Sequence, residues 1–237
     1  MKDGRKSVCA IILARSGSKG LKNKNIRDLN GKPLISYTIN DAKNSRFIDK
    51  IIVSTDSQEI AKIANEFGAE TPFLRPKEIA KDLTTSEKAL MHALTYLNEK
   101  ENYFPDIIVY LQITEPFRPK NIIDDCIQYM LNDEKLDSVF AGHVKHKNYW
   151  EEIDEKFVRI SKVSQSPLPR QIKKPVLRED TGVALATKSS VILSGKRIGK
   201  NVKIVPYEHE LGFIDIHTDF DLRLSNLIEN NLDELYE

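Results

Sequence analysis

The sequence predicts an α/β protein built on a doubly wound, mostly parallel sheet. Over the first two-thirds of the 237-residue chain, short apolar runs alternate with longer segments whose apolar residues recur at helical spacing. Near-continuous apolar runs are typical of strands buried on both faces, which need helices to cover them. A glycine-rich basic loop directly after the first run supports the same class, because ligand-binding loops follow the strands of such sheets.

The first part of the chain supplies most of the predicted elements. Its strands are expected at residues 8–13, 48–56 and 106–111. Its helices, in which apolar residues stand three and four positions apart, are expected at residues 33–45, 57–67, 84–99 and 121–131. Gly68 follows the second helix as a stop signal, and Thr85 is positioned to cap the third.

The pattern changes between about residues 139 and 178. Strand-like pieces at 138–144 and 157–163 flank polar stretches, and the Ser-Pro-Leu-Pro sequence at 166–169 excludes regular structure. We interpret this part as a small excursion from a single domain of residues 1–237, serving as a lid, an arm or a dimerisation element. The sheet is expected to resume at the segments 182–186, 202–206 and 213–216, before a helix from Thr218.

The composition argues against several kinds of partner. With 36 basic and 35 acidic residues the net charge is +1, which gives no overall attraction to nucleic acid or to a membrane surface. Cys9 and Cys126 lie in apolar patterns without C-x-x-C spacing, which indicates buried thiols. A signal peptide and an apolar run of 18 residues are both lacking, so we expect a cytoplasmic protein without a membrane partner.

The basic loop at residues 14–25 is the most informative stretch of the sequence. Gly17 and Gly20 permit tight turns and close approach of backbone N–H groups to an anion. Four cations in the loop can meet several phosphates at once: Arg15, Lys19, Lys22 and Lys24. The loop fits neither the P-loop nor the dinucleotide-binding pattern. It therefore predicts a nucleoside triphosphate site of another kind, and the alternative is an ordinary solvated loop.

Several motifs in fixed order resemble one family. They are ILARSGSKGLKNKNI, GKPLISYTI, IIVSTDSQEIAKIANEFGAE, FLRPKEIAKD, LQITEPFR, PRQ and FIDIHTDFDL. Together they resemble the CMP-sugar synthetases of the acylneuraminate cytidylyltransferase type, which activate nonulosonic acids such as sialic, legionaminic or pseudaminic acid. The resemblance implies a Rossmann-like nucleotidyltransferase fold, CTP as donor, Mg²⁺ or Mn²⁺ as cofactor, and a homodimer. It also implies that the anomeric hydroxyl of an acidic sugar attacks the α-phosphorus of CTP and that pyrophosphate leaves.

The resemblance assigns site residues by position. The nucleotide-binding set is Ala14, Arg15, Ser18, Lys19, Gly20, Lys24, Asn25, Arg75 and Ser86. The sugar-binding set is Gln112, Arg118 and Arg170, since an arginine fork suits a carboxylate. Arg15, Lys24 and Asp215 are the expected catalytic residues, with Asp215 and His217 as the expected metal ligands.

Three departures from the family pattern concern the sugar and metal positions. The usual Asp-Ile-Asp-Thr reads Asp-Ile-His-Thr at 215–218, Glu115 stands in place of serine, and Thr181 stands in place of asparagine. Imidazole is a poorer Mg²⁺ ligand than carboxylate. The same fold acting on 3-deoxy-octulosonate or a sugar 1-phosphate therefore stays open as an alternative, and so does a catalytically silent nucleotide-binding homologue.

Overall fold

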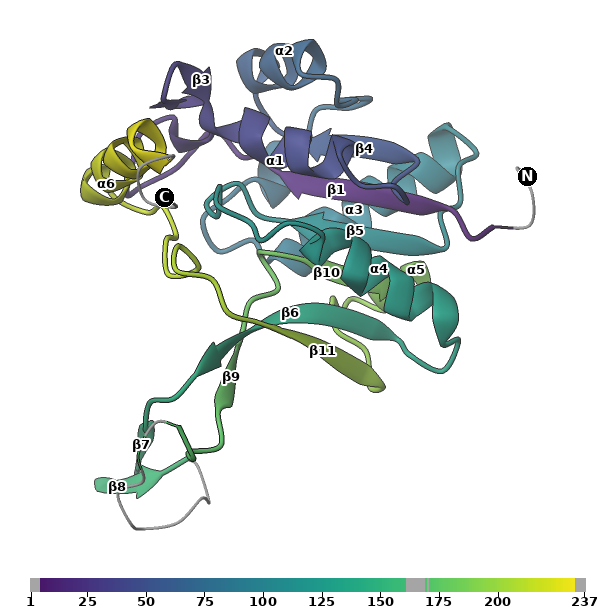
Figure 1. Cartoon of the computed structure of the whole chain (residues 1–237). Helices are drawn as coiled ribbons and strands as arrows, with labels where there is room; N and C mark the ends of the chain where they lie inside the picture. Colours follow the sequence, from purple (N-terminus) through teal and green to yellow (C-terminus); the bar gives the residue numbers. More distant parts are fainter. Residues whose placement is uncertain (1–4, 161–168, 170, 233–237) are drawn as a thin grey trace.

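The computed structural model describes residues 5–160, 169 and 171–232 (Figure 1). Within these residues one sheet contains seven strands. Six of them follow the order β11 (Val202–Tyr207), β6 (Ser138–Lys145), β10 (Leu185–Lys188), β5 (Ile107–Leu111), β1 (Val8–Leu13) and β4 (Lys50–Ser54). The seventh, β9 (Val176–Glu179), pairs with the far part of β6.

The strand directions confirm a mostly parallel sheet. β1 runs parallel to β4 and β5, and β11 runs parallel to β6. Only β9 and β10 run against the other strands of this described sheet. These two return along β6 after a hairpin-like excursion, and without a helical crossover a returning neighbour has to be antiparallel.

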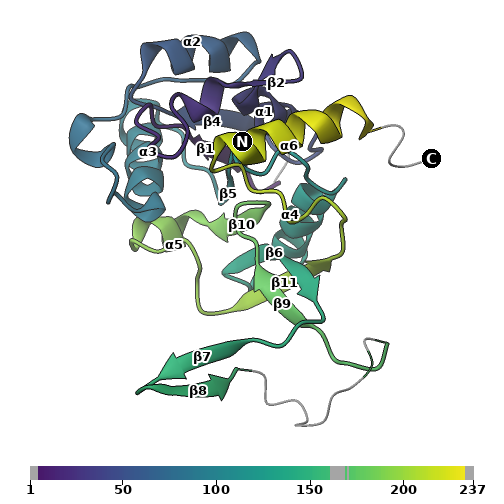
Figure 2. The same ribbon diagram turned by 90° about the vertical axis from the view of Figure 1, so that its left-hand side faces the viewer.

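Helices cover both faces of the sheet (Figures 1 and 2). α1 (Leu34–Lys43), α2 (Gln58–Glu66) and α4 (Ile122–Asn132) pack on one face, against the core that contains Val8, Ala10 and Ile12 of β1. α3 (Ser86–Lys100) and α5 (Ser189–Leu193) cover the other face, against Cys9 and Ile11. This alternation along β1 is the reason that its sequence reads as a continuous apolar run.

The helix boundaries agree with the sequence signals. Ser57 caps α2 by accepting a hydrogen bond from the backbone of Ile60, and Thr85 caps α3 through Lys88. Thr218 and Asp221 form a reciprocal capping box at the start of α6 (Asp219–Asn230), which lies beside the short ribbon of β2 (Asp28–Leu29) and β3 (Lys32–Pro33). Among the described helices, none is long and apolar enough to cross a membrane.

The predicted strand at 213–216 is wrong. The segment turns through a hydrogen bond from Ile214 N to Leu211 O, and Ile216 N then donates to Thr114 O, in the loop after β5, at 2.8 Å. It passes the end of the sheet and does not run along its edge. It therefore makes no ladder of hydrogen bonds with the described strands.

The excursion leaves the sheet later than the sequence indicates. The predicted piece at 138–144 is β6, a full strand of the sheet, so the segment beyond the sheet begins after Lys145. It continues as a hairpin of β7 (Trp150–Ile153) and β8 (Lys156–Arg159), which stands apart from the sheet in both views (Figures 1 and 2). We call this hairpin the arm. The predicted positions 161–163 and the Ser-Pro-Leu part of 166–168 lie outside the described residues.

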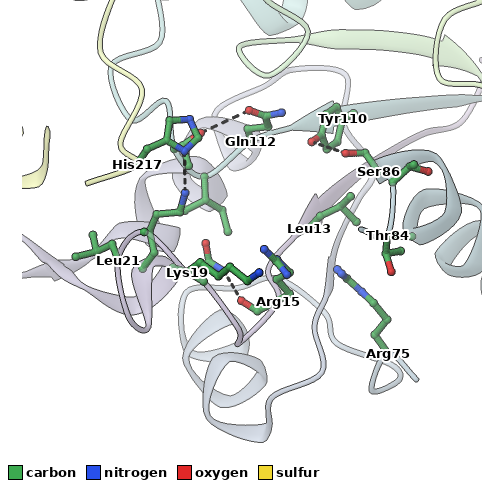
Figure 3. A pocket seen from close by; sticks show the side chains of 18 residues that line it. Leu13, Arg15, Lys19, Leu21, Arg75, Thr84, Ser86, Tyr110, Gln112 and His217 are labelled. Carbon is green, nitrogen blue, oxygen red and sulfur yellow. Dashed lines mark hydrogen bonds between the residues drawn. The ribbon is translucent and has the colours of Figure 1, made fainter. Parts of the chain in front are cut away.

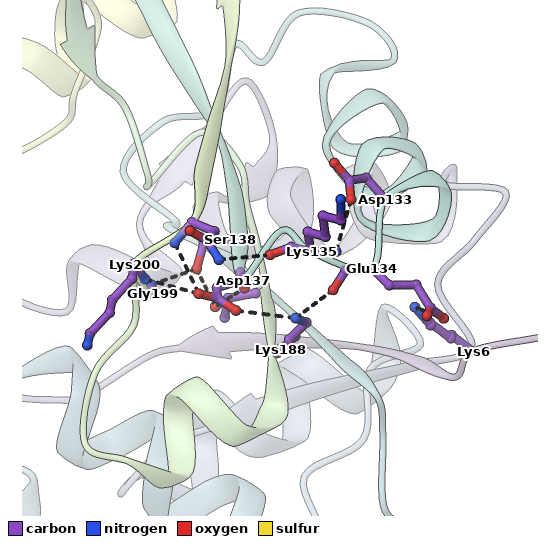
Figure 4. Close-up of polar contacts among 11 residues, drawn as sticks. Lys6, Asp133, Glu134, Lys135, Asp137, Ser138, Lys188, Gly199 and Lys200 are labelled. Carbon is purple, nitrogen blue, oxygen red and sulfur yellow. Dashed lines mark hydrogen bonds and ion pairs between the residues drawn. The ribbon is translucent and has the colours of Figure 1, made fainter.

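A carboxylate joins three strands at the edge of the sheet opposite the basic loop. Asp137, just before β6, accepts hydrogen bonds from the backbone N–H groups of Lys200 and Asn201 at 3.2 and 3.0 Å. Its other oxygen pairs with Lys188 of β10 at 3.2 Å (Figure 4). Gly199 permits this close approach, because a Cβ there would lie 2.3 Å from the Asp137 side chain. The starts of β6 and β11 and the end of β10 are thereby held together.

Candidate active site

A cleft of about 410 Å³ opens at the carboxyl ends of β1 and β5 (Figure 3). Nine of the predicted nucleotide and sugar residues line it: Arg15, Ser18, Lys19, Gly20, Lys24, Asn25, Arg75, Ser86 and Gln112. His217 also lines it, whereas Lys22 is exposed and does not. The cleft thus gathers residues from five separate parts of the sequence at the edge where parallel sheets bind ligands.

Three hydrogen-bonding contacts hold the basic loop in place. Ala14 is buried below the cleft, and its N–H donates to Ser54 O at 3.0 Å. Ser16 donates through both its backbone N–H and its hydroxyl to Asp56, at 2.8 and 2.7 Å. The Asn25 amide donates to Arg15 O at 2.8 Å, which ties the end of the loop to its start. The loop therefore presents its cations from a fixed backbone.

Four cations give the cleft a positive wall. Arg15, Lys19 and Arg75 lie across from Tyr110 and Gln112 (Figure 3), and Lys24 completes the set. Arg75 is buried, and its guanidinium donates to Ser54 Oγ at 3.0 Å and to Ser54 O. Burial lowers the pKa of Arg75 to about 10, which leaves it charged near neutral pH. Such a wall suits a ligand with several negative charges.

His217 connects Lys24 to Asp215. Lys24 Nζ lies 3.5 Å from His217 Nδ1, and His217 Nε2 lies 2.9 Å from a carboxylate oxygen of Asp215. The two ring nitrogens of His217 therefore face opposite partners, a cation on one side and a carboxylate on the other. Burial lowers the pKa of Lys24, and the nearby Asp215 carboxylate opposes that effect. The side chains of Lys24, His217 and Asp215 are thus linked in a row beside the cleft.

The donors around Asp215 fit a metal ion only with help from substrate. Among the described residues, no group of three or more His, Cys, Asp or Glu side chains is arranged to hold a metal. Asp215 and His217 offer two donors. Mg²⁺ commonly binds nucleotides through one or two carboxylates, phosphate oxygens and water, so the residues present are compatible with such a shared site.

Gly20 lets the basic loop touch the segment that carries Asp215 and His217. A Cβ at Gly20 would lie 2.6 Å from the backbone oxygen of His217. Any side chain there forces the two segments apart, because real Cβ atoms do not approach a backbone oxygen so closely. Gly20 therefore fixes the spacing between the basic loop and the segment that carries Asp215.

If the chain has the CTP-dependent activity that the sequence resemblance implies, Gly20→Ala is expected to lower its kcat/KM on the order of a hundredfold, since it displaces the loop relative to Asp215. Gly17→Ala is the matched control, because a Cβ at Gly17 meets no atom within 4 Å. Steady-state kinetics of both variants, with thermal melting to check folding, provide the measurement. Equal kinetics for the two variants would contradict the spacing role.

The end of β5 carries the other half of the cleft. Gln112 is fixed by its own N–H, which donates to Gly182 O at 2.8 Å, and its side chain lines the cleft. The Ser86 hydroxyl lies 3.4 Å from the hydroxyl of Tyr110. Sequence reasoning missed Tyr110, although its place in the last predicted apolar run before Gln112 was a usable signal. Polar groups of this half face the cationic wall.

Glu115 lies behind Gln112 as a buried carboxyl group. A Cβ at Gly182 would lie 2.1 Å from Glu115 Oε2 and 2.6 Å from Gln112 Oε1, so both oxygens press against the same glycine. Burial raises the pKa of Glu115 to about 7, although Arg118 opposes that effect. The departure at position 115 thus places a large titratable group next to the expected sugar-contacting glutamine.

Arg118 does not take the expected position beside a substrate. Its side chain is 2 % exposed. All five guanidinium N–H groups meet protein acceptors, namely Val183 O, Thr38 Oγ1, Asp41, Gln112 O and Gly182 O. It fastens the loop after β5 to α1 and to the 182–183 turn, which leaves no donor for a ligand. Arg170 lies outside the described residues.

Taken together, the fold and the cleft define an α/β protein with a basic ligand site at the carboxyl edge of its parallel strands. A sequence model of the cytidylyltransferase family matches residues 9–236. The chain belongs to the cytidylyltransferase family.

The relatives include several that act on nonulosonic acids. An N-acylneuraminate cytidylyltransferase of Escherichia coli is 41% identical over 137 residues, 58% of this chain and 31% of that protein. A pseudaminic acid cytidylyltransferase of Campylobacter jejuni is 38% identical over 129 residues, 54% of this chain and 55% of that protein. The chain therefore spans between about a third and about half of these two relatives. The post-translational flagellin modification protein B of Campylobacter coli is 28% identical over 231 residues, covering 95% of this chain and 97% of that protein.

A solved structure shares the fold. A CMP:2-keto-3-deoxy-manno-octonic acid synthetase complexed with CTP matches with a TM-score of 0.70 at 16% identity, covering 95% of this chain and 99% of that one. At this identity the likeness concerns the fold alone, and it confirms the nucleotidyltransferase fold expected from the sequence.

Proposed function

We propose that the protein transfers CMP from CTP to the anomeric hydroxyl of an acidic nonulosonic sugar and releases pyrophosphate. The observation that carries the proposal is the cleft of about 410 Å³, which four cations and Gln112 line together. A triphosphate brings about four negative charges near neutral pH, which such a wall can neutralise. The relatives named for sialic and pseudaminic acid support the choice of acceptor.

Different residues of the cleft hold different parts of the two substrates. Arg75 and Ser86 hold the base and ribose, while Arg15, Ser18, Lys19 and Lys24 hold the triphosphate. Gln112 orients the sugar, whose anomeric oxygen attacks the α-phosphorus. The new phosphorus–oxygen bond forms as the bond to pyrophosphate breaks, and the hydroxyl proton goes to a base or to solvent. Catalysis then rests on alignment and on stabilising charge at the phosphate oxygens.

A divalent ion completes the proposed site. Asp215 and His217 would hold Mg²⁺, or Mn²⁺ in its place, together with oxygens of the triphosphate. When bound, the ion supplies charge neutralisation at the α-phosphate. Because the reaction consumes CTP, an intracellular nucleotide, the proposal keeps the expected cytoplasmic location, with neither nucleic acid nor membrane as partner.

A second acceptor class is favoured by one feature of this chain. The turn after β5 reads Gln112, Ile113, Thr114, Glu115 and Pro116, and it resembles the Gln-x-x-Glu-Pro turn of 3-deoxy-octulosonate synthetases. That sugar is also an acidic keto sugar with an anomeric hydroxyl. A sugar 1-phosphate acceptor has no such feature in its favour.

Pyrophosphate release from CTP tests the proposal directly. The purified chain is incubated with CTP, Mg²⁺ and a panel of sialic, legionaminic and pseudaminic acids, 3-deoxy-octulosonate and a sugar 1-phosphate. We expect sugar-dependent release with one of the nonulosonic acids and much less with ATP, GTP or UTP. Turnover only with 3-deoxy-octulosonate or the sugar 1-phosphate would replace the acceptor. CTP binding without turnover on any acceptor would favour the catalytically silent homologue.

The arm supports a homodimer. Trp150 and Phe157 of its two strands are 60% and 70% exposed, and further large apolar side chains are exposed close by. An isolated two-stranded hairpin is marginally stable in water, and a second copy of the chain would cover these side chains.

We expect wild-type protein to sediment as a dimer at micromolar concentration, and a variant with residues 146–175 replaced by a short Gly-Ser loop to sediment as a monomer. The loop joins β6 directly to β9, which already pair as neighbours. Thermal melting of the shortened variant checks that the sheet still folds. Monomeric wild-type protein would refute the dimer.

A further inference from the structure

Asp82 already holds two of the cations that should bind the triphosphate. One oxygen of its carboxylate lies 2.5 Å from Arg15 Nη1, and the other lies 2.7 Å from Lys19 Nζ. Both partners line the cleft. Asp82 belongs to the loop at residues 80–84, which joins the short helix η2 (Lys77–Ile79) to α3. We call this loop the strap, because it reaches from one side of the cleft to the basic loop.

The Asp82 carboxylate contacts these two cations as one edge of a phosphate group would. A carboxylate presents two oxygens on a planar fork, and here each oxygen takes a different cation from the basic loop. A phosphate between Arg15 and Lys19 would present two of its own oxygens in the same way. Hydrogen bonds from Lys19 and then Arg15 lower the pKa of Asp82, so its side chain is the anion that these cations hold.

The contact is suited to being displaced. Asp82 is 37% exposed and Lys19 is 81% exposed, and ion pairs at such positions contribute little to stability. Next to Asp82, the side chain of Leu83 is 96% exposed, so the tip of the strap is not anchored in the core. A single carboxylate carries one negative charge, whereas a triphosphate carries about four near neutral pH. The triphosphate therefore attracts the two cations more strongly than Asp82 does.

We propose that Asp82 occupies a phosphate position of the nucleotide site, and that the strap moves when a polyphosphate takes that position. The inference rests on the proposed function for the identity of the polyphosphate, CTP. Asp82 is then an internal competitor: it keeps Arg15 and Lys19 paired in the empty cleft, and it returns to them as pyrophosphate leaves. When CTP binds, a phosphate replaces the Asp82 carboxylate on Arg15 and Lys19. When pyrophosphate leaves, the carboxylate takes its place again.

The proposal predicts that removing the carboxylate strengthens binding. Asp82→Asn keeps the side-chain size but gives up the charge. We expect it to bind pyrophosphate and CTP roughly two- to tenfold more tightly than wild-type protein, as the loss of two exposed ion pairs implies. Under turnover, KM for CTP should fall and kcat should fall with it, because pyrophosphate leaves more slowly. A residue that merely supports the fold would give the opposite sign, weaker binding.

Isothermal titration of the full chain with inorganic pyrophosphate, and separately with CTP, measures this effect. The matched control is Glu78→Gln, which removes the same charge from the helix before the strap, where Glu78 forms no ion pair among the described residues. Asp82→Glu should bind like wild-type protein, and thermal melting checks the fold of each variant. Affinity of Asp82→Asn equal to that of Glu78→Gln, or weaker than wild type, would overturn the proposal.

The two proposals fail separately. Pyrophosphate binding needs no sugar, so tighter binding by Asp82→Asn stands even if the acceptor panel gives no turnover. Conversely, full cytidylyl transfer together with unchanged binding by Asp82→Asn would overturn the competitor role alone. Wild-type protein that binds neither CTP nor pyrophosphate would overturn both.

Discussion

Asp215→Asn is expected to lower turnover by a factor on the order of 10² to 10³, whereas His217→Asn lowers it by only about tenfold. The asparagine keeps the shape but loses the negative charge that would pair with a divalent ion. His217 is bonded to Asp215 through Nε2 and to Lys24 through Nδ1, so its loss mainly disturbs the positions of its neighbours. Initial rates at several Mg²⁺ concentrations measure both variants.

Two further measurements sharpen this prediction. His217→Asp restores the second carboxylate of the family pattern and should keep or raise the activity in Mg²⁺. If His217 binds the ion directly, wild-type protein should respond unusually well to Mn²⁺ or Co²⁺, because imidazole favours those ions. Full activity of Asp215→Asn in Mg²⁺, or undiminished wild-type activity in excess chelator, would refute the metal site.

Lys24→Ala is expected to lower kcat/KM for CTP by about ten- to a hundredfold, since a charge-assisted contact contributes roughly 1.5–3 kcal/mol. Lys24 lines the cleft and is held by His217 beside Asp215. Both kcat and CTP affinity should fall while the melting temperature stays close to that of wild type. Steady-state kinetics at saturating sugar give the two parameters.

Lys22→Ala is the matched control for Lys24. It removes the same charge from the same loop, but Lys22 is exposed and does not line the cleft. Its kinetics should stay within about twofold of wild type, as is usual for an exposed residue without a specific contact. A loss in Lys22→Ala as large as that in Lys24→Ala would mean that only the overall charge of the loop matters.

Local signals predicted the helices well because their causes are local. The caps at Ser57, Thr85 and Thr218 act within one helical turn, and the apolar spacing of α3 depends only on its own sequence. The strand expected at 213–216 failed for the opposite reason. Ile214 and Ile216 are buried at alternate positions, as they would be in a strand, but strand formation also needs a free neighbouring edge, which no local pattern reveals.

The position of the basic loop in the cleft was easier to predict than the positions of the expected sugar-binding residues. The residues of the basic loop are contiguous, so their presence in one cleft follows from the strand that precedes them. Arg118 looked like a carboxylate ligand by residue type, yet all of its guanidinium N–H groups donate to protein acceptors. The ion pairs of Asp82 were not predicted, because an acidic residue in a loop has no pattern that points to two cations more than sixty positions earlier.

The pairing of β9 with β6 affects the position of Gln112. β9 pairs with β6 up to Glu179, Asp180 N then donates to Ala141 O, and two residues later Gly182 accepts from the backbone of Gln112. β9 and the turn at residues 180–182 are thus joined to Gln112 by consecutive backbone hydrogen bonds. A shift of β9 along β6 would therefore move Gly182, where even a methyl group would not fit beside Gln112 and Glu115. The position of Gln112 in the cleft therefore depends on the pairing of β6 with β9 as well as on β5.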